Sequence, residues 1–175
     1  FTLRRIETPR PVGERFNYAA KMNRLWRAAT TEQIVFMNDD LTPTGDGWLK
    51  GLQTFALDES VGGVGARLLF EDGSLQHAGF APFGMCTVHP WIFRKRAEGT
   101  YQEWARVHRE WSMVTGALFA TRRSLMEQVN GFDERFSLEF NDTDLCLRLR
   151  TLGYRIVCTP DAEMIHVEKA SRGET

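Results

Sequence analysis

The feature that most constrains this chain is a short apolar segment that ends in acidic side chains. Gln33–Met37 has the length of a strand and does not alternate between apolar and polar residues, and Asn38, Asp39 and Asp40 follow it directly. Such a strand is typical of a parallel sheet that helices cover on both faces. Ligands in open α/β sheets bind outside the carboxyl ends of the strands. The three polar residues therefore stand where such a fold places its site.

Strands and helices alternate along much of the chain, which predicts an α/β sandwich formed by one domain, residues 1–175. Helices are predicted at residues 14–29, 48–57, 124–129 and 141–152. Further strands are predicted at residues 61–70, 74–80, 111–121 and 154–158, the last of which ends before Pro160. The turn signal Asp72-Gly73 predicts a hairpin. We expect a mainly parallel or mixed sheet with this β-hairpin inserted, and an irregular, aromatic-rich segment at residues 82–110.

Composition excludes several classes of function. The net charge of −1 over 175 residues gives no basic excess for binding nucleic acid. Three scattered cysteines are too few for a disulfide scaffold, which favours a reducing, cytoplasmic location. No apolar run approaches the ~20 residues of a membrane span. The first residue is Phe1, which predicts that the chain is processed or is a fragment of a longer protein.

Two acidic clusters and one histidine are candidates for chemistry, and each also has a structural interpretation. The oxygens of Asn38-Asp39-Asp40 suit Mg²⁺ or Mn²⁺ bridged to a diphosphate, but such residues also form ordinary polar turns. Asn141 and Asp142 begin a predicted helix, where they serve as caps unless the carboxylate faces the first cluster and acts as a general base. His166 is either a structural hydrogen-bonding residue or a ligand for an ion such as Mn²⁺. Gln76-His77 is a weaker candidate.

Signatures of several other chemistries are missing from the sequence. It has no Gly-x-Ser-x-Gly elbow, no His-Glu-x-x-His and no Walker-type phosphate loop. The glycine-dense segment Gly62-Gly63-Val64-Gly65 lies inside a predicted strand and does not fit the dinucleotide fingerprint. We interpret it as a place where backbone and neighbouring side chains pack tightly.

Eight motifs, taken in chain order, resemble one family over nearly the whole chain. They are Phe16-Asn17-Tyr18-Ala19-Ala20-Lys21-Met22-Asn23, Ile34-Val35-Phe36-Met37-Asn38-Asp39-Asp40, Val64-Gly65-Ala66-Arg67-Leu68-Leu69 with Asp72-Gly73, Gln76-His77-Ala78-Gly79, Val114-Thr115-Gly116-Ala117, Gly131-Phe132-Asp133-Glu134, Asn141-Asp142-Thr143-Asp144-Leu145-Cys146-Leu147-Arg148, and Gly153-Tyr154-Arg155-Ile156-Val157 with His166 beyond. This order is similar to family 2 of the glycosyltransferases, in the rhamnosyltransferase-like branch. The resemblance implies the Rossmann-like GT-A fold.

The resemblance also implies a metal and donor site. Asn38-Asp39-Asp40 stands where the family carries its Asp-x-Asp motif, so Asp40 would hold Mg²⁺ or Mn²⁺ while Asn38 and Asp39 lie against the sugar nucleotide. His166 matches a position that completes the metal site in related enzymes. Gly116 would line the donor-sugar pocket.

A catalytic base and an acceptor site follow from the same resemblance. Asp142 matches the second residue of the family's Glu-Asp pair, which is the base. The aromatic segment from Phe83 to Trp111 would shape the acceptor site, and Trp111 is the residue that we assign to it. The tryptophans of this segment fit a core or interface role equally well.

Two kinds of departure from the family stand out. Asn38 and Asn141 each replace an acid, which removes negative charge and predicts a modest metal affinity. Family members open with strand–helix–strand units that bind the base and ribose, and this chain begins after them. We therefore expect an N-terminally truncated form that binds nucleotide sugar weakly and is inactive alone.

The expected activity is metal-dependent transfer of a sugar from a nucleotide-diphosphate donor, with inversion, to a saccharide or lipid-linked acceptor in polysaccharide biosynthesis. Two other interpretations stay open. One is a non-catalytic module for binding or assembly, whose unpaired sheet edge invites dimerisation. The other is a metal-dependent nucleotidyltransferase, which gives no natural place to Asn141-Asp142 and His166. Peripheral association with a membrane stays open as well.

Overall fold

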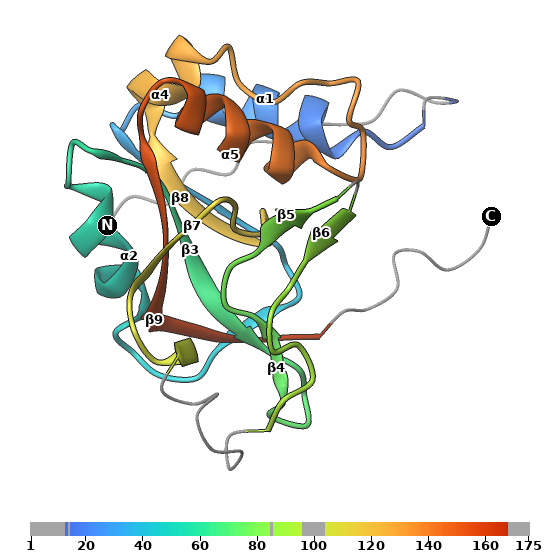
Figure 1. The fold of residues 1–175 in the computed structure, drawn as a ribbon. Helices are drawn as coiled ribbons and strands as arrows, with labels where there is room; N and C mark the ends of the chain where they lie inside the picture. Colours follow the sequence, from blue (N-terminus) through green and yellow to red (C-terminus); the bar gives the residue numbers. More distant parts are fainter. Residues whose placement is uncertain (1–12, 14, 85, 96–103, 168–175) are drawn as a thin grey trace.

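The computed structural model describes residues 13, 15–84, 86–95 and 104–167. The helices are α1 (Tyr18–Ala28), α2 (Trp48–Ala56), α4 (Arg123–Gln128) and α5 (Asn141–Thr151). The strands are β1 (Gln33–Met37), β2 (Leu41–Pro43), β3 (Val61–Leu69), β4 (Leu75–His77), β5 (Ala81–Phe83), β6 (Cys86–Val88), β7 (Arg109–Trp111), β8 (Leu118–Arg122) and β9 (Arg155–His166). Figure 1 shows the helices around a central sheet, with the small β5–β6 hairpin beside α5.

The central sheet has the strand order β1-β8-β3-β9-β2, with β4 paired to β3 and β7 paired to β9. β3 and β9 run parallel, whereas the other strand pairs within the described residues are antiparallel. The predicted α/β class is confirmed. The sheet is mixed rather than mainly parallel because β8 returns antiparallel between β1 and β3.

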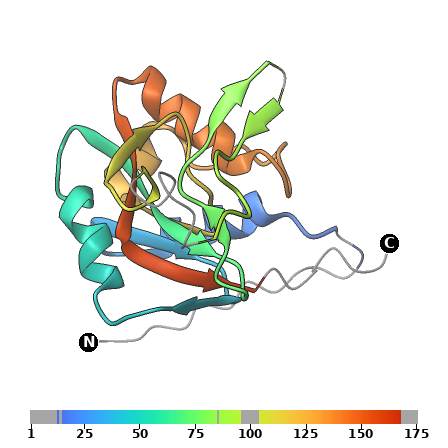
Figure 2. The same ribbon diagram turned by 60° about the horizontal axis from the view of Figure 1, so that its bottom comes forward.

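Two apolar cores cover the two faces of the sheet. On one face, α1, α4 and α5 pack against the sheet, and Leu149 of α5 shares that core with Phe36 of β1. On the other face, Leu52 of α2 joins Val64 of β3, and Val35 packs against this second core. Figure 2 shows α2 on the opposite side of the sheet from α4 and α5. Consecutive residues of β1 thus face two different apolar cores. Because both faces of the strand are covered, its sequence does not alternate between apolar and polar residues.

Glycines in β3 allow large side chains to lie directly on the strand, as the sequence predicted. A Cβ added at Gly63 would lie 2.4 Å from Cζ of Phe119. A Cβ added at Gly65 would lie 2.5 Å from Cβ of Val114. The predicted hairpin is also confirmed, since β3 and β4 pair antiparallel and Gly73 turns between them with a φ of 75°.

β9 is longer than the sequence predicted. It continues past Pro160 to His166, over 12 residues. Thr159 and Glu163 pair with neighbouring residues of β3, so residues 160–162 form a bulge without partners on that strand. A bulge accepts proline, which has no N–H to donate to a ladder. The prediction that the strand ends before Pro160 was therefore wrong.

A single predicted strand at residues 111–121 is two strands in the structure. β7 ends at Trp111 and β8 begins at Leu118. Between them, the N–H groups of Thr115 and Gly116 donate to side chains, at His77 and Asp142, instead of to a neighbouring strand. The segment predicted as irregular, residues 82–110, contributes the β5–β6 pair.

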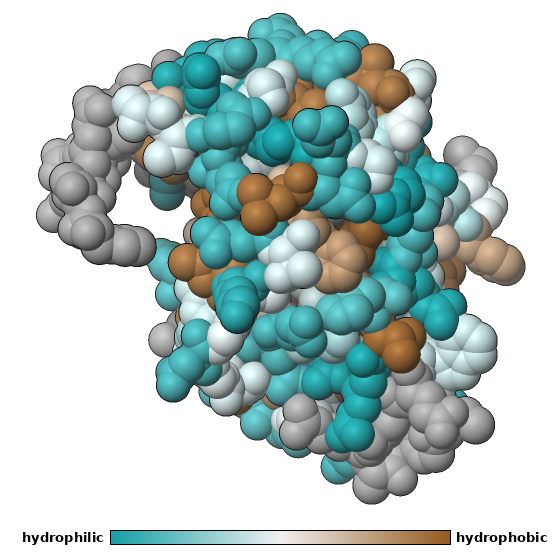
Figure 3. All heavy atoms as spheres, turned by 90° about the vertical axis from the view of Figure 1, so that its left-hand side faces the viewer, coloured by the Kyte–Doolittle hydropathy of each residue, from teal (hydrophilic) through white to brown (hydrophobic). Residues whose placement is uncertain are grey.

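The surface offers little apolar area on the side that carries α2. Figure 3 shows that face as mostly hydrophilic, with hydrophobic residues in separate spots rather than in one patch. Among the described residues, no helix combines the length and the apolar character needed to cross a membrane.

Candidate active site

Asp40 and His166 meet at the end of the sheet where β2 pairs with β9. Leu41 lies opposite His166 in the antiparallel register, which brings the preceding residue, Asp40, beside the histidine. The N–H of Val167 donates to the Asp40 carbonyl at 3.0 Å. Asp40 Oδ1 lies 3.1 Å from His166 Nε2, and the two side chains are only 21% and 11% exposed.

The Asp40–His166 pair fits a divalent cation. Oδ1 of Asp40 is buried and, apart from its approach to His166 Nε2, has no hydrogen-bond partner among the described residues, so it is an acceptor that a cation can satisfy. Within the described residues, no cluster of three or more His, Cys, Asp or Glu side chains is arranged to hold a metal ion. Two protein donors are nevertheless enough for Mg²⁺ or Mn²⁺ when phosphate oxygens and water supply the remaining ligands.

Asp142 lies at the start of α5 and is directed towards the segment before β8. Its Oδ2 accepts from Gly116 N–H at 2.9 Å, and its Oδ1 accepts from Thr143 N–H at 2.7 Å. The predicted capping of this helix by Asn141 or Asp142 was wrong. Phe140 occupies the cap position with a φ of 61° and makes no side-chain cap, and the Asn141 amide donates to the Leu138 carbonyl.

Gly116 connects Asp142 to α1. Its carbonyl accepts from the Tyr18 hydroxyl at 3.3 Å, while its N–H donates to Asp142. Burial, and then the charge of Asp142, raise the pKa of Tyr18 well above its usual value, so the hydroxyl keeps its proton. A Cβ at Gly116 would lie 3.3 Å from Cβ of Asp142. Glycine thus lets the carboxylate approach the backbone.

Hydrogen bonds join the two parts of the site. Asn38 N–H donates to the Ala117 carbonyl at 2.9 Å, directly beside the residue that holds Asp142. The chain segment that carries Asp40 and the one that holds Asp142 are therefore neighbours at the end of the sheet where β1 stops and β8 begins. Asp39, by contrast, is exposed.

A pair of histidines, His77 buried and His89 half-buried, lies between these parts. His77 Nε2 accepts from the N–H groups of Gly79 and Thr115, and its Nδ1 lies 3.2 Å from Nδ1 of His89. Burial lowers the pKa of His77 well below its usual value, and nearby His89 and His166 add to this. Burial also lowers the pKa of His89, against an opposing effect of Asp142. Sequence reasoning ranked Gln76-His77 low and did not find His89, because only tertiary contacts bring it here.

Trp111, predicted to bind the acceptor, packs closely inside the protein. A Cβ at Gly79 would lie 2.2 Å from Cδ1 of the indole, and the ring meets Trp91 edge to face at 5.9 Å. The indole also packs against the core on the α5 side of the sheet. Its acceptor role stays a prediction.

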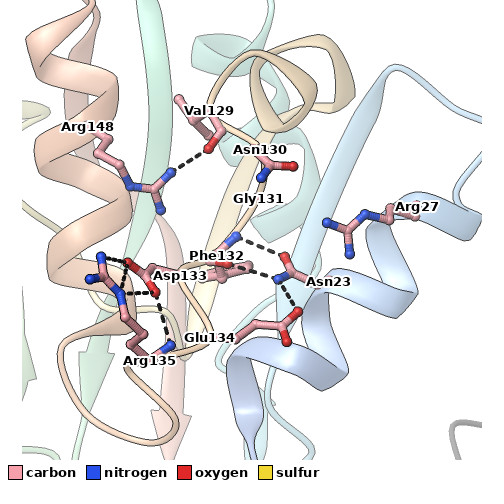
Figure 4. A pocket seen from close by; sticks show the side chains of 10 residues that line it. All are labelled: Asn23, Arg27, Val129, Asn130, Gly131, Phe132, Asp133, Glu134, Arg135 and Arg148. Carbon is pink, nitrogen blue, oxygen red and sulfur yellow. Dashed lines mark hydrogen bonds and ion pairs between the residues drawn. The ribbon is translucent and has the colours of Figure 1, made fainter.

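A separate polar cavity of about 460 Å³ lies between α1 and the segment that leads to α5. Figure 4 shows its lining, with Asn23 in the middle of a hydrogen-bond network. The Asn23 amide donates to the Phe132 carbonyl and to Glu134, and its oxygen accepts from Phe132 N–H and from Trp26 Nε1. The motif Gly131-Phe132-Asp133-Glu134 therefore attaches α1 to the segment before Asp142, rather than contacting the Asp40–His166 pair.

The sequence profile described as "Glycosyltransferase like family 2" matches residues 4–175. The chain belongs to this family. Among curated proteins, it is 39% identical over 163 residues to the O-antigen biosynthesis protein RfbC of Myxococcus xanthus, covering 90% of this chain and 12% of that protein. It is 34% identical over 97 residues to N-acetylglucosaminyl-diphospho-decaprenol L-rhamnosyltransferase of Mycobacterium tuberculosis, covering 55% of this chain and 30% of that protein. The chain thus spans less than a third of either relative.

Solved structures share the fold. The mannosyltransferase PcManGT from Pyrobaculum calidifontis, in complex with GDP-Man and Mn²⁺, matches with a TM-score of 0.60 at 20% identity, over 92% of this chain and 39% of that one. GalNAc-T7 with UDP, GalNAc and Mn²⁺ matches with a TM-score of 0.69 at 10% identity, over 93% of this chain and 32% of that one. The predicted likeness to GT-A glycosyltransferases is confirmed at the level of the fold.

Proposed function

We propose that the protein transfers a sugar from a nucleoside-diphosphate donor to an acceptor hydroxyl, with inversion at the anomeric carbon. The observation that carries the proposal is the convergence of three distant segments. Asp40 and His166 lie 3.1 Å apart, and Asn38, two residues before Asp40, is hydrogen-bonded to the segment that holds Asp142. Membership of the family and the nucleotide-sugar complexes of the similar structures support this reading.

Asp142 is the base of the proposed reaction. As the acceptor oxygen bonds to the anomeric carbon, Asp142 takes the hydroxyl proton. The bond from that carbon to the diphosphate oxygen breaks, and the nucleoside diphosphate leaves with the bonding electrons. One direct displacement inverts the anomeric carbon. The N–H groups of Gly116 and Thr143 keep the carboxylate oriented before the acceptor arrives.

The Asp40–His166 pair is the proposed holder of Mg²⁺ or Mn²⁺. A cation there acts as a Lewis acid that offsets the charge of the departing diphosphate. The buried Oδ1 of Asp40, which lacks a hydrogen-bond partner among the described residues, supports the assignment. Both similar structures are complexes that contain Mn²⁺, which supports Mn²⁺ as the cation of the proposed site.

Asn38, Asp39 and Gly116 are assigned to the donor side, and Trp111 to the acceptor side. Asn38 and Gly116 belong to segments in direct contact with each other, which supports a shared donor pocket. The names of the two relatives, an O-antigen biosynthesis protein and a rhamnosyltransferase acting on a lipid-linked sugar, support a saccharide or lipid-linked acceptor.

Replacement of Asp142 by asparagine tests the base. In the complete gene product, Asp142→Asn is expected to lower the turnover number by about 10²–10⁴, because a positioned base contributes that much. Binding of the donor, measured by calorimetry, is expected to change little.

Asp144→Asn is the matched control, since it removes the same charge from the same helix. Asp144 pairs with Arg148 at 2.6 Å and does not contact Gly116. Its turnover is expected to stay within a few-fold of the wild type. Near-normal turnover of Asp142→Asn would exclude Asp142 as the base.

A further inference from the structure

Gln76, the central residue of β4, contacts His166 through the ring nitrogen that does not face Asp40. Its Oε1 lies 2.6 Å from Nδ1 of His166, on the opposite side of the imidazole from Asp40. The residue is only 9% exposed. Its amide nitrogen is also buried and has no hydrogen-bond partner among the described residues. Gln76 therefore contacts a residue of the proposed metal site, although the proposed reaction assigns it no part.

The contact determines where the proton of His166 lies. A carbonyl oxygen only accepts hydrogen bonds, so Nδ1 of His166 carries the hydrogen and donates it to Gln76. In a neutral imidazole the other nitrogen, Nε2, then keeps a lone pair. That lone pair lies 3.1 Å from Oδ1 of Asp40, which is itself an acceptor without a hydrogen-bond partner among the described residues.

Two acceptor atoms in one buried place repel each other unless a proton or a metal cation lies between them. Without Gln76, His166 would be free to take the Nε2–H tautomer, which neutral histidine favours in water. Nε2–H would donate to Asp40, and the two atoms would satisfy each other without a cation. The residue at position 76 therefore determines whether His166 Nε2 donates a hydrogen bond to Asp40 or whether both atoms keep their lone pairs for a cation.

We propose that Gln76 is a positioning residue that fixes His166 in the Nδ1–H tautomer and so keeps Nε2 and Asp40 available to a divalent cation. This inference rests on the proposed function, because it deepens the role of the same pair. Outer partners that orient a ligating histidine typically change metal affinity by about 10–100-fold when they are removed.

Nitrogen NMR of histidine tests the tautomer directly. The protein has 4 histidines, so selective ¹⁵N-histidine labelling gives a spectrum that single His→Ala variants can assign. At pH 8 and without metal, His166 is expected to show a protonated Nδ1 and an unprotonated Nε2. Gln76→Met removes the acceptor at similar length and is expected to move His166 towards the Nε2–H form.

Mn²⁺ binding, followed by electron paramagnetic resonance of the free ion, provides the second measurement. Gln76→Met is expected to weaken Mn²⁺ binding by about 10–100-fold. Gln76→Glu, which keeps an acceptor at the same place, is expected to retain both the Nδ1–H signal and the affinity. Gln53→Met, on the exposed face of α2, is the matched control and is expected to change neither. Rescue by Glu separates positioning from a general loss of structure.

The outcomes distinguish this inference from the proposed function. If Asp40→Asn leaves Mn²⁺ binding intact, the metal assignment fails and the inference fails with it. If Asp40→Asn removes binding while Gln76→Met keeps both the Nδ1–H tautomer and the affinity, Gln76 has no positioning role and the proposed function stands.

Discussion

One backbone N–H group sets the direction of the Asp142 carboxylate. The sequence allowed two uses for an acid at a helix start, as a cap or as a base, and both need the same residue type in the same place. The contact with Gly116, which is distant in the chain, turns the carboxylate towards the segment before β8 and so favours the proposed use as a base. Asp40 and His166 were predicted from residue chemistry and from the family resemblance. Gln76 was only a weaker candidate, because its contact with His166 depends on the register of β4 against β3.

The three cysteines are expected to differ strongly in reactivity. Cys86 is exposed, whereas burial raises the pKa of both Cys146 and Cys158 to about 12. At pH 8 roughly one in 10⁴ of the buried thiols is a thiolate, which is the reactive form. Titration with a thiol reagent should therefore label Cys86 quickly and the other two only after urea is added. Rapid labelling of three thiols in the native protein would contradict the packing around α5 and β9.

Most helices and strands were predicted at nearly their observed positions, because apolar periodicity and turn residues are local signals. α2, β1 and the β3–β4 hairpin follow this rule. The predicted strand bounds were wrong in two situations. In one, a backbone N–H donates to a side chain from elsewhere in the fold, and in the other a β-bulge accommodates a proline. The break between β7 and β8 has the first cause, and the continuation of β9 past Pro160 has the second. Local propensity contains no information about either.

Packing on the glycines of β3 is expected to limit substitution there. Gly63→Ala places a methyl group 2.4 Å from the ring of Phe119, which is buried in the core. Overpacking of this kind costs about 1–3 kcal/mol in the free energy of unfolding, measured with urea. Gly45→Ala is the control, since a Cβ there has nothing within 4 Å, and it should be near neutral. An unchanged stability for Gly63→Ala would show that the ring moves aside freely.

At the scale of the whole molecule, the candidate site forms only when three distant segments are folded together. Ligands that bind such a site stabilise the folded state, by about 2.7 kcal/mol at 100 times the dissociation constant. For a chain of this size that energy corresponds to a rise of roughly 5–10 °C in Tm, and in a longer protein the rise is smaller. We expect Mn²⁺ with UDP, GDP or TDP to raise the Tm of the complete gene product in a thermal-shift assay. Asp40→Asn should abolish the effect, and a panel without any shift would favour a non-catalytic module.

The bulge in β9 separates the side-chain alternation of the two halves of the strand. Ala66 and Arg67 are successive residues of β3 and face opposite sides of the sheet, whereas their partners Thr159 and Glu163 lie four positions apart on β9. The direction of His166 is therefore set by how residues 163–166 pair with β3 and β2, and not by the number of residues in the bulge. Evolution can thus lengthen, shorten or rewrite residues 160–162 without disturbing the histidine, and natural variants of this chain should differ more in the bulge than in the four residues after it.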